Sequence, residues 1–320
     1  MISNLLVTGG CGFIGSNFIN FFYHQVQNCR IINIDALYYC ASVENINENI
    51  RNDNQRYVFI NINLSDIKHN LKQIMTFYNV DYIIHFAAQS HVQNSFSNSL
   101  QYTKDNIVGT HMLLEACRGN SNLKLFIHIS TDEVYGESMI GDSESKKTEE
   151  SVLCPTNPYA ATKAGAELIA QSYYHSFKMP IVITRGNNVY GANQYPEKLI
   201  PCFIKCLKEG KKVPIQGKGD NVRAFIHVDD VCSALKIILE KGKVGEIYNI
   251  GSDDHSERTV LEVAQKLIQI LCHTNQFEDW VEYVEDRPFN DKRYFISNQK
   301  LKDLGWEIKI DFEEGLLNLI

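Results

Sequence analysis

The segment Thr8-Gly9-Gly10-Cys11-Gly12-Phe13-Ile14-Gly15 follows an apolar run at residues 5–7 and opens a helical pattern. It contains GxGxxG, with one further glycine in front. Glycines permit a tight turn and let backbone amides approach a pyrophosphate at the positively polarised end of a helix. Asp35 ends the next apolar run, where a carboxylate accepts hydrogen bonds from an adenosine ribose and repels a 2′-phosphate. The segment therefore predicts a site for NAD rather than NADP. The alternative is a glycine-rich turn without a cofactor, in which Asp35 only caps a loop, because such a turn would have the same sequence pattern.

Short apolar runs recur along the first half of the chain, at residues 5–7, 30–34, 57–60, 82–86, 125–129 and 181–184. Helical segments lie between them, notably 100–117 and 159–177. Strands without polar alternation are typical of a parallel sheet covered on both faces. The pattern predicts an α/β fold, a Rossmann-type doubly wound parallel sheet with a smaller, interleaved C-terminal substrate domain. We expect an NAD-binding domain with the catalytic residues at 1–184 and a mainly substrate-binding domain at 185–320, with 223–251 returning to the main sheet.

Composition excludes several classes of protein. The 320 residues carry a formal net charge of −7, which argues against nonspecific binding to nucleic acid or to a membrane. No apolar run reaches the roughly 18 residues of a membrane span. The nine cysteines are scattered, and Cys202 and Cys206 have no ligand pair nearby. We expect reduced thiols, no metal site and a cytoplasmic location.

Two further segments carry chemistry. Thr131, Asp132 and Glu133 follow the apolar run 125–129, and Tyr159 and Lys163 share one face of a helix. A Tyr/Lys pair handles the proton of a sugar hydroxyl during hydride transfer, and the ammonium should lower the phenol pKa. An acid and a base beside that pair indicate that water is also eliminated. Taken alone, each motif is equally typical of solvated surface charges.

Other residues fit the cofactor by their place at strand ends. Asn63 and Leu64 follow the third run and would flank the adenine, and small residues after the fourth run let a cofactor pass close to the backbone. The complete set expected to bind NAD is Gly9, Gly12, Phe13, Ile14, Gly15, Asp35, Asn63, Leu64, Ala87, Ala88, Ser90, Tyr159 and Lys163.

The motifs together resemble the extended short-chain dehydrogenase/reductase family, and within it the nucleotide-sugar 4,6-dehydratases, from residue 4 to about 317. The resemblance is carried by TGGCGFIG at 8–15, HFAAQSHV at 85–92, STDEVYG at 130–136, NPYAATKAGAE at 157–167, RGNNVYG at 185–191 and RPFNDKRY at 287–294. The 4-epimerases of this family usually lack the acid–base pair of TDEVYG. At Gln89, Asn94, 185–189 and 287–290 the chain is more similar to the dehydratase part of plant-type UDP-rhamnose synthases than to bacterial dTDP-glucose enzymes.

The resemblance implies a redox-neutral reaction on UDP-glucose. Tyr159, with Thr131 on the same oxygen, takes the 4-hydroxyl proton as hydride leaves carbon 4. Glu133 removes the carbon-5 proton, and Asp132 protonates the departing 6-hydroxyl. Hydride then returns to carbon 6 and carbon 5 is reprotonated, which gives UDP-4-keto-6-deoxyglucose on the way to a sugar such as rhamnose. The substrate contacts implied, with arginines for the diphosphate, are Ser90, Thr131, Asn188, Lys198, Leu199, Pro214, Gln216, Arg223, Arg287 and Asn290.

The resemblance also implies a homodimer formed through segments 100–117 and 159–177. Because the chain stops at Ile320, we expect a separate epimerase or reductase to complete the 6-deoxy sugar. Three other functions stay open: a dTDP-glucose 4,6-dehydratase, a UDP-glucose 4-epimerase and a noncatalytic NAD-binding sensor.

Overall fold

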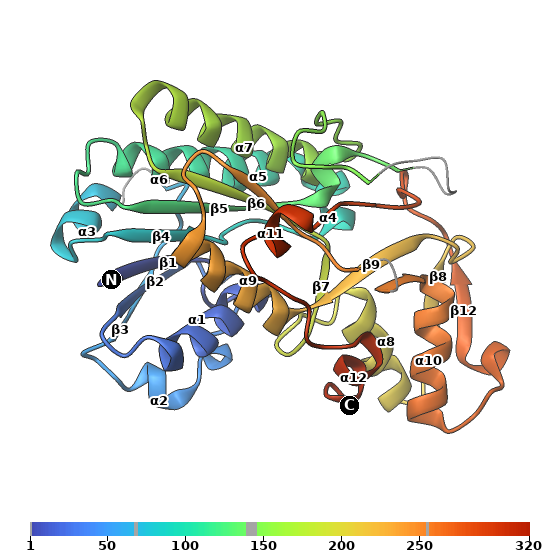
Figure 1. Ribbon diagram of the computed structural model, residues 1–320. Helices are drawn as coiled ribbons and strands as arrows, with labels where there is room; N and C mark the ends of the chain where they lie inside the picture. Colours follow the sequence, from blue (N-terminus) through green and yellow to red (C-terminus); the bar gives the residue numbers. More distant parts are fainter. Residues whose placement is uncertain (1, 67–69, 139–145, 254–255) are drawn as a thin grey trace.

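The computed structural model describes residues 2–66, 70–138, 146–253 and 256–320, and Figure 1 shows its strands and helices in chain order. The strands are β1 (Asn4–Thr8), β2 (Arg30–Asp35), β3 (Tyr57–Asn61), β4 (Tyr82–His85), β5 (Leu125–Thr131), β6 (Ile181–Gly186), β7 (Asn188–Tyr190), β8 (Val213–Gln216), β9 (Val222–His227), β10 (Ile247–Ile250), β11 (Glu257–Thr259) and β12 (Val281–Val284). The α-helices are α1 (Phe13–Gln25), α2 (Glu48–Arg51), α3 (Leu71–Phe77), α4 (Val92–Ser97), α5 (Ser99–Tyr102), α6 (Gly109–Cys117), α7 (Pro158–Phe177), α8 (Leu199–Lys208), α9 (Val228–Lys241), α10 (Val260–Cys272), α11 (Gln299–Lys302) and α12 (Phe312–Leu317). Shorter helical turns are η1 (Val43–Asn45), the π-helical η2 (Thr103–Val108), η3 (Asp132–Tyr135) and η5 (Phe277–Trp280).

The main sheet has seven strands in the order β10-β6-β5-β4-β1-β2-β3, and every pairing in it is parallel. This confirms the predicted doubly wound parallel sheet. The strand order reverses between β1 and β4, which is the place where ligands bind in open sheets of this kind, beyond the carboxyl ends of the strands. The glycine-rich turn after β1 and the small residues after β4 both lie there.

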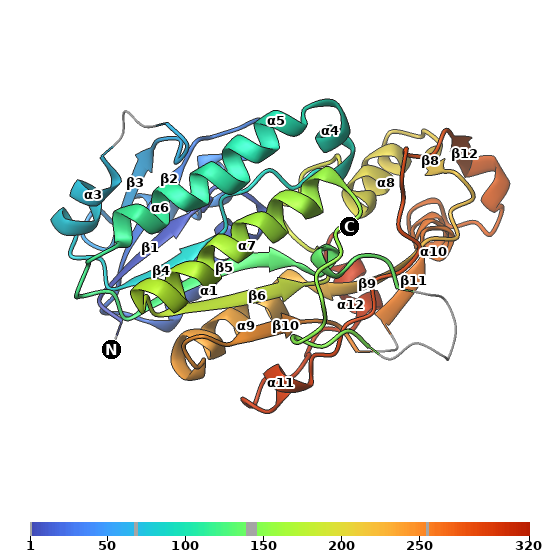
Figure 2. The same ribbon diagram turned by 90° about the horizontal axis from the view of Figure 1, so that it is seen from above.

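Each face of the sheet is covered by helices, as Figure 1 shows from the side and Figure 2 from above. Along β1, Leu5 and Val7 belong to the core beneath α1 and α9, whereas Leu6 belongs to the core beneath α3, α6 and α7. Successive side chains of a strand point to opposite faces, so an apolar run without alternation fills both cores at once.

The C-terminal half adds a smaller lobe with its own core. Its core joins α8 and α10 to β8, β9 and β12. Of the segment 223–251, β10 lies in the main sheet beside β6, and α9 packs against α1. The expectation that the whole segment returns to the main sheet is wrong for β9, which pairs with β7 and β11 in a separate three-stranded sheet. An apolar run alone does not specify its partner strand.

The long helix expected at 100–117 is interrupted. It consists of α5, the π-helical turn η2 and α6. A π-helical turn widens the helix by one residue and is frequent at functional sites. Here it carries Asp105, whose carboxylate accepts hydrogen bonds from the side chains of Gln89 and Gln101 at 3.0 and 2.9 Å. It also carries Asn106, which donates to Thr162 Oγ1 of α7 at 2.9 Å.

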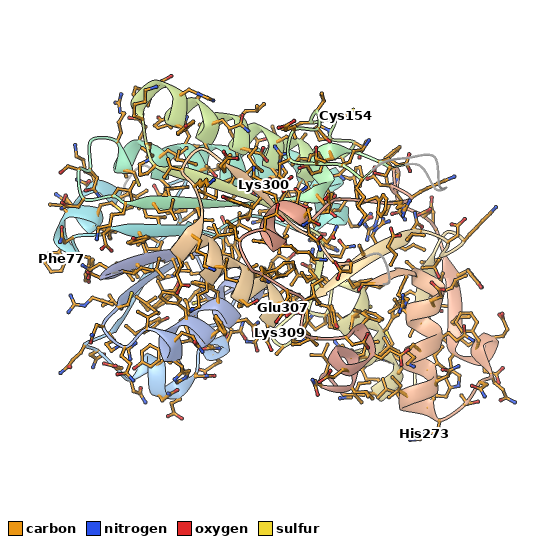
Figure 3. The ribbon with its side chains drawn as sticks, viewed as in Figure 1. Phe77, Cys154, His273, Lys300, Glu307 and Lys309 are labelled. Atoms are coloured by element: carbon orange, nitrogen blue, oxygen red, sulfur yellow. The ribbon has the colours of Figure 1, made fainter. Side chains whose placement is uncertain are left out.

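Side chains fill the space between the helices and the sheet (Figure 3). All nine cysteines are free thiols. Cys11, Cys29, Cys117 and Cys232 are buried, whereas Cys154 is exposed at the surface.

A buried ion pair joins α7 to β6. Arg185 and Glu167 are 2% and 0% exposed, and Arg185 Nε donates to both carboxylate oxygens at 3.1 Å. Arg185 Nη1 also donates to the Tyr135 hydroxyl at 2.7 Å. The pair therefore fixes the helix that carries Tyr159 and Lys163 against the strand beside β5.

Replacing one partner of this pair should destabilise the protein strongly. Glu167→Gln leaves the Arg185 guanidinium buried without a counter-charge, which costs about 3 kcal/mol or more of unfolding free energy. Urea unfolding measures the loss. Glu209→Gln, which removes the exposed partner of Lys211, should leave the transition unchanged. Equal urea unfolding transitions for the two variants would show that the buried ion pair does not stabilise the packing of α7.

Candidate active site

A cavity of about 530 Å³ opens at the carboxyl ends of the main sheet and extends toward the C-terminal lobe. Every predicted site residue except Asp132 lines it. They are Gly9, Gly12, Phe13, Ile14, Gly15, Asp35, Asn63, Leu64, Ala87, Ala88, Ser90, Thr131, Glu133, Tyr159, Lys163, Asn188, Lys198, Leu199, Pro214, Gln216, Arg223, Arg287 and Asn290. Residues from 9 to 290 thus share one space.

The turn after β1 needs its glycines for steric reasons. Gly9 has φ +72°, and a Cβ there would lie 2.6 Å from the backbone nitrogen of Ala87. A Cβ on Gly15 would lie 2.3 Å from the carbonyl oxygen of Gly9. Gly12 is the N-cap of α1 and has no side chain to occupy the first amides of the helix. The turn therefore leaves a concave backbone surface at a helix N-terminus, which suits a pyrophosphate.

Asp35 both holds the glycine-rich turn in place and lines the cavity. Its carboxylate accepts hydrogen bonds from the backbone amides of Cys11 and Leu37 at 2.9 and 2.8 Å, so it fastens the glycine-rich turn to the end of β2. The side chain also lines the cavity. Burial raises the pKa of this carboxyl, and the backbone hydrogen bonds oppose that rise.

Next to Asp35, one wall of the cavity is a hydrogen-bonded group that the sequence did not indicate. Asn63 donates to the hydroxyl of Tyr38 at 2.8 Å, and that hydroxyl donates to Asp105 at 3.2 Å. Tyr38 and Asp105 both line the cavity. Only the π-helical turn, which is not visible in the sequence, brings Asp105 here.

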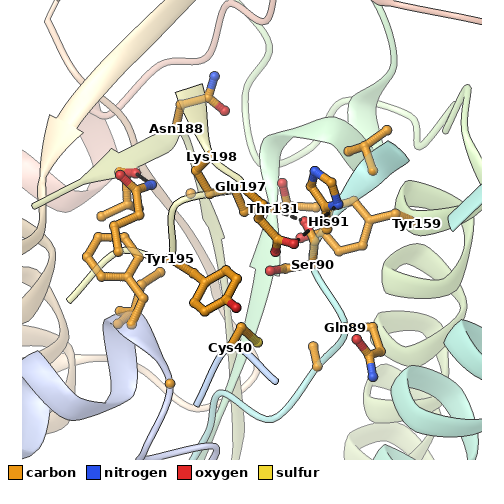
Figure 4. A pocket seen from close by; sticks show the side chains of 18 of the residues that line it. Cys40, Gln89, Ser90, His91, Thr131, Tyr159, Asn188, Tyr195, Glu197 and Lys198 are labelled. Carbon is orange, nitrogen blue, oxygen red and sulfur yellow. Dashed lines mark hydrogen bonds and ion pairs between the residues drawn. The ribbon is translucent and has the colours of Figure 1, made fainter. Parts of the chain in front are cut away.

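Tyr159 of α7 lies beside Thr131 at the end of β5 (Figure 4), and Lys163 follows four residues later on the same helix. Lys163 Nζ donates to the carbonyl oxygen of Ile129 at 2.6 Å, and burial lowers the pKa of this lysine to about 8. The expectation of a lowered phenol pKa is wrong for this arrangement. Burial and then the charge of Glu133 raise the pKa of Tyr159, and only a hydrogen bond with Thr131 lowers it.

The two carboxyls lie in the turn η3, immediately after Thr131. Burial, followed by the charge of Glu133, raises the pKa of Asp132 to about 7. Burial also raises the pKa of Glu133, but hydrogen bonding by Asn157 and the charge of Arg223 oppose that rise. Asp132 is 2% exposed and lies behind the cavity wall, whereas Glu133 faces the cavity. Near neutral pH the pair is suited to be one acid and one base.

A positively charged region lies across the cavity from the glycine-rich turn. Arg223 donates to Asn290 Oδ1 at 3.1 Å, and its guanidinium lies 5.2 Å from the ring centre of Tyr294. Burial and then the charge of Arg223 lower the pKa of Arg287. Two cations held close together are stabilised by an anion such as a diphosphate.

A second hydrogen-bonded group joins the two halves at the cavity, and three of its members, Tyr39, His91 and Glu197, were not predicted from the sequence. Tyr39 donates to Glu197 at 2.7 Å, and His91 Nδ1 lies 3.5 Å from the same carboxylate oxygen. Lys198 Nζ donates to the carbonyl oxygen of Ser90 at 2.7 Å. His91, Glu197 and Lys198 appear together in Figure 4. No local pattern signals this group, because its members come from three distant loops.

The fold and cavity define a class of α/β protein in which a glycine-rich turn and a Tyr/Lys pair adjoin one buried carboxyl, Asp132, and one half-buried carboxyl, Glu133. A family model described as GDP-mannose 4,6 dehydratase matches residues 6–319, and the chain belongs to that family. This confirms the resemblance inferred from the motifs.

Two curated relatives and one solved structure illustrate the range of the family. The chain is 44% identical over 313 residues to a trifunctional UDP-glucose 4,6-dehydratase/UDP-4-keto-6-deoxy-D-glucose 3,5-epimerase/UDP-4-keto-L-rhamnose-reductase of Arabidopsis thaliana, covering 98% of this chain and 46% of that protein. It is 44% identical over 319 residues to the dTDP-D-glucose 4,6-dehydratase of Homo sapiens, covering 99% and 88%. The dTDP-glucose 4,6-dehydratase of Bacillus anthracis, crystallised in complex with NAD, superposes with a TM-score of 0.87 at 39% identity, covering 98% and 94%. The chain therefore spans less than half the length of the plant relative.

The described parts of the chain contain neither a candidate metal site nor a candidate membrane span. Residues 2–66, 70–138, 146–253 and 256–320 contain no group of three His, Cys, Asp or Glu side chains that could hold a metal ion. No helix among them is long and apolar enough to cross a membrane.

The raised pKa of Asp132 predicts a pH-dependent cost to stability. The folded protein keeps this proton up to about pH 7, whereas an unfolded aspartic acid loses it near 3.8, so the unfolding free energy falls as pH rises between these values. Asp132→Asn removes the cost. It should be more stable than the native protein at pH 8, by an amount on the order of a few kcal/mol, and equal to it near pH 4.

Denaturant unfolding at both pH values measures the difference. Glu48→Gln, at an exposed carboxyl of α2, should show no such pH-dependent gain. A constant difference between Asp132→Asn and the native protein at all pH values would contradict a raised pKa at this position.

Proposed function

We propose that this chain is a UDP-glucose 4,6-dehydratase that converts UDP-glucose to UDP-4-keto-6-deoxyglucose with bound NAD. The observation that carries the proposal is the carboxyl pair of the buried Asp132 and the half-buried Glu133, close to Tyr159 and Lys163. A hydroxyl oxidation needs only the Tyr/Lys pair. The added acid and base are what an elimination of water requires.

The residues that would hold NAD fit its parts. The backbone of the turn 9–15 would bind the pyrophosphate, Asp35 the adenosine ribose, and Asn63 and Leu64 the adenine. Ala87, Ala88 and Ser90 would leave room along the backbone, and Tyr159 and Lys163 would contact the far end. When bound, NAD would supply a hydride acceptor for carbon 4 in its oxidised form and a hydride donor for carbon 6 once it is reduced, and the positive charge of the oxidised form would favour the Tyr159 phenolate.

The residues that would hold the nucleotide sugar lie mainly in the C-terminal lobe. Arg223 and Arg287 would bind the diphosphate. Ser90 and Thr131 would contact the sugar, and the remaining contacts would come from Asn188, Lys198, Leu199, Pro214, Gln216 and Asn290. The mutual repulsion of the two arginines supports this assignment, because a diphosphate placed between them relieves it.

In the proposed reaction, Tyr159 accepts the proton of the 4-hydroxyl while Thr131 holds the same oxygen. The ketone formed at carbon 4 acidifies the proton on carbon 5, and Glu133 removes it. Asp132 protonates the 6-hydroxyl, which leaves as water. The pKa of Asp132 near 7 supports its role as the acid, because the carboxyl still carries a proton at neutral pH.

UDP-glucose is proposed over dTDP-glucose from the resemblance to plant-type enzymes at Gln89, Asn94, 185–189 and 287–290. A plant UDP-glucose enzyme and a human dTDP-glucose enzyme are equally identical to this chain, at 44%. The nucleotides differ by the 5-methyl group of the base, worth about 1–3 kcal/mol in an apolar pocket, and by the ribose 2′-hydroxyl that dTDP lacks. The test must therefore compare the two substrates directly.

Incubating the purified protein with UDP-glucose and, separately, with dTDP-glucose should convert the UDP sugar faster. We expect loss of one water by mass and no net accumulation of NADH, because the hydride returns to the same sugar. Faster turnover of dTDP-glucose would overturn the nucleotide choice alone. Unchanged mass with UDP-galactose formed would indicate a 4-epimerase. No reaction with either substrate would favour a noncatalytic NAD-binding protein.

The keto sugar formed would still need epimerase and reductase steps to become a sugar such as rhamnose. The plant relative bears both activities in its name, in addition to the dehydratase.

We also propose a homodimer formed through segments 100–117 and 159–177, whose helices α5, α6 and α7 lie side by side in Figure 2. Large apolar side chains are exposed on these elements, with Leu100 84%, Leu168 55% and Val108 40% exposed. Sedimentation should show a dimer that Leu168→Glu shifts toward monomer. The matched change Phe77→Glu, at an exposed residue of α3, should not. A monomeric native protein would refute the proposal.

A further inference from the structure

Each of the two carboxyls is held by the side-chain amide of an asparagine. Asn157 Nδ2 donates to Glu133 Oε2 at 2.9 Å, and Asn187 Nδ2 donates to Asp132 Oδ2 at 2.6 Å. Both asparagines are buried, at 5% and 6% exposed. Neither has a role in the chemistry described above.

The orientation of each amide is fixed from its other end. The backbone amide of Ala160 donates to Asn157 Oδ1 at 2.9 Å, as the N-cap bond of α7. The backbone amide of Ser252 donates to Asn187 Oδ1 at 2.9 Å. Since each amide oxygen is occupied by a backbone donor, each NH₂ group must face its carboxyl and cannot exchange places with the oxygen.

This orientation assigns the oxygens of each carboxyl. An NH₂ group only donates, so Asp132 Oδ2 and Glu133 Oε2 must both be acceptors. Asp132 Oδ1 shares a hydrogen bond of 3.2 Å with the Thr131 hydroxyl, which can donate to this oxygen or accept from it, so Oδ1 is the oxygen that can carry the proton of Asp132. On Glu133, the Tyr294 hydroxyl also approaches Oε2, at 3.5 Å. Among the described residues, none hydrogen-bonds to Glu133 Oε1, which remains available to take a proton.

We propose that Asn157 and Asn187 are positioning residues that separate the base from the acid in the elimination step. Asn157 directs Glu133 Oε1 to the carbon-5 proton, and Asn187 keeps the transferable proton on Asp132 Oδ1. The carbon–hydrogen bond breaks with its proton on Glu133, the proton of Asp132 joins the 6-hydroxyl, and the carbon–oxygen bond breaks to release water. The inference rests on the proposed function, because it assumes the base and acid roles of the two carboxyls.

The electrostatic surroundings agree with this division. Hydrogen bonding by each asparagine favours the charged form of its carboxyl and lowers the pKa against the effect of burial. The other charged or titratable groups that face the pair are Tyr159, Lys198, Arg223, Arg287, Asp291 and Tyr294. Replacing either asparagine removes none of these groups, so a shift in a pH profile is attributed to the lost amide.

The test compares Asn157→Ser, Asn187→Ser and a matched Asn298→Ser. Serine at 157 still accepts the N-cap hydrogen bond of α7 and loses only the donor to Glu133. Asn298 is also 6% exposed and donates to a backbone carbonyl and to Asp253, but it lies outside the cavity lining. Circular dichroism checks folding, and Asn187→Asp, which keeps the acceptor for Ser252, replaces Asn187→Ser if that variant does not fold.

We expect kcat for water loss to fall by about 10- to 100-fold in both site variants, with KM little changed. Losing the donor raises the pKa of the base Glu133, so Asn157→Ser should move the acidic limb of the kcat profile to higher pH by about one unit. Losing the donor raises the pKa of the acid Asp132, so Asn187→Ser should move the alkaline limb to higher pH. Asn298→Ser should move neither limb.

A lower kcat with both limbs of the pH profile unmoved would overturn the inference and leave the asparagines with a structural role only. Native activity in both variants would overturn it as well. Glu133→Gln and Asp132→Asn separate this failure from a failure of the proposed function. If those two variants block water loss while the asparagine variants behave as the native protein, only the positioning role is wrong. If water loss persists without either carboxyl, the proposed acid and base roles are wrong themselves.

Discussion

The seven strands of the main sheet all run in one direction, and the rest of the site depends on this constraint. Parallel strands place all their carboxyl ends at one edge. Four of these ends bear the site: the glycine-rich turn follows β1, Asp35 ends β2, the small residues follow β4, and Thr131 ends β5. Parallel pairing of the strands is therefore enough to place the residues expected to bind the cofactor next to the catalytic residues.

Burial then determines the charges at that edge. A low dielectric disfavours every charged form, which raises the pKa of the two carboxyls and of Tyr159 and lowers that of Lys163. The groups become different from one another only through their individual partners. Asn157 and the charge of Arg223 lower the pKa of Glu133, whereas for Asp132 the charge of Glu133 raises the pKa by more than Asn187, Thr131 or Arg223 each lowers it. Two neighbouring carboxyls with the same backbone setting thus acquire different proton affinities.

The sequence revealed the parts of the site that are local patterns. The turn 9–15, Asp35, the pair at 132–133 and the Tyr159/Lys163 spacing each fall within a few residues of a strand end or helix start. It did not reveal contacts between distant loops, such as Tyr39 with Glu197, 158 positions apart. It also gave the wrong sign for the Tyr159 pKa, because the spacing to Lys163 is visible in sequence but the degree of burial is not. For β9, the sequence predicted the strand but not the strands with which it pairs.

Several single side chains connect the chemistry to the architecture. Asn157 begins α7 and holds Glu133, so the base and the helix carrying Tyr159 and Lys163 share one anchor. Asn187 lies between β6 and β7 and links Asp132 to the backbone after β10. The arginines proposed for the diphosphate come from the C-terminal lobe, while the carboxyls come from the main sheet. Strands β6, β7 and β10 join the C-terminal lobe to the main sheet. The position of a substrate held by those arginines, relative to the carboxyls, would therefore depend on how these three strands hold the two regions together.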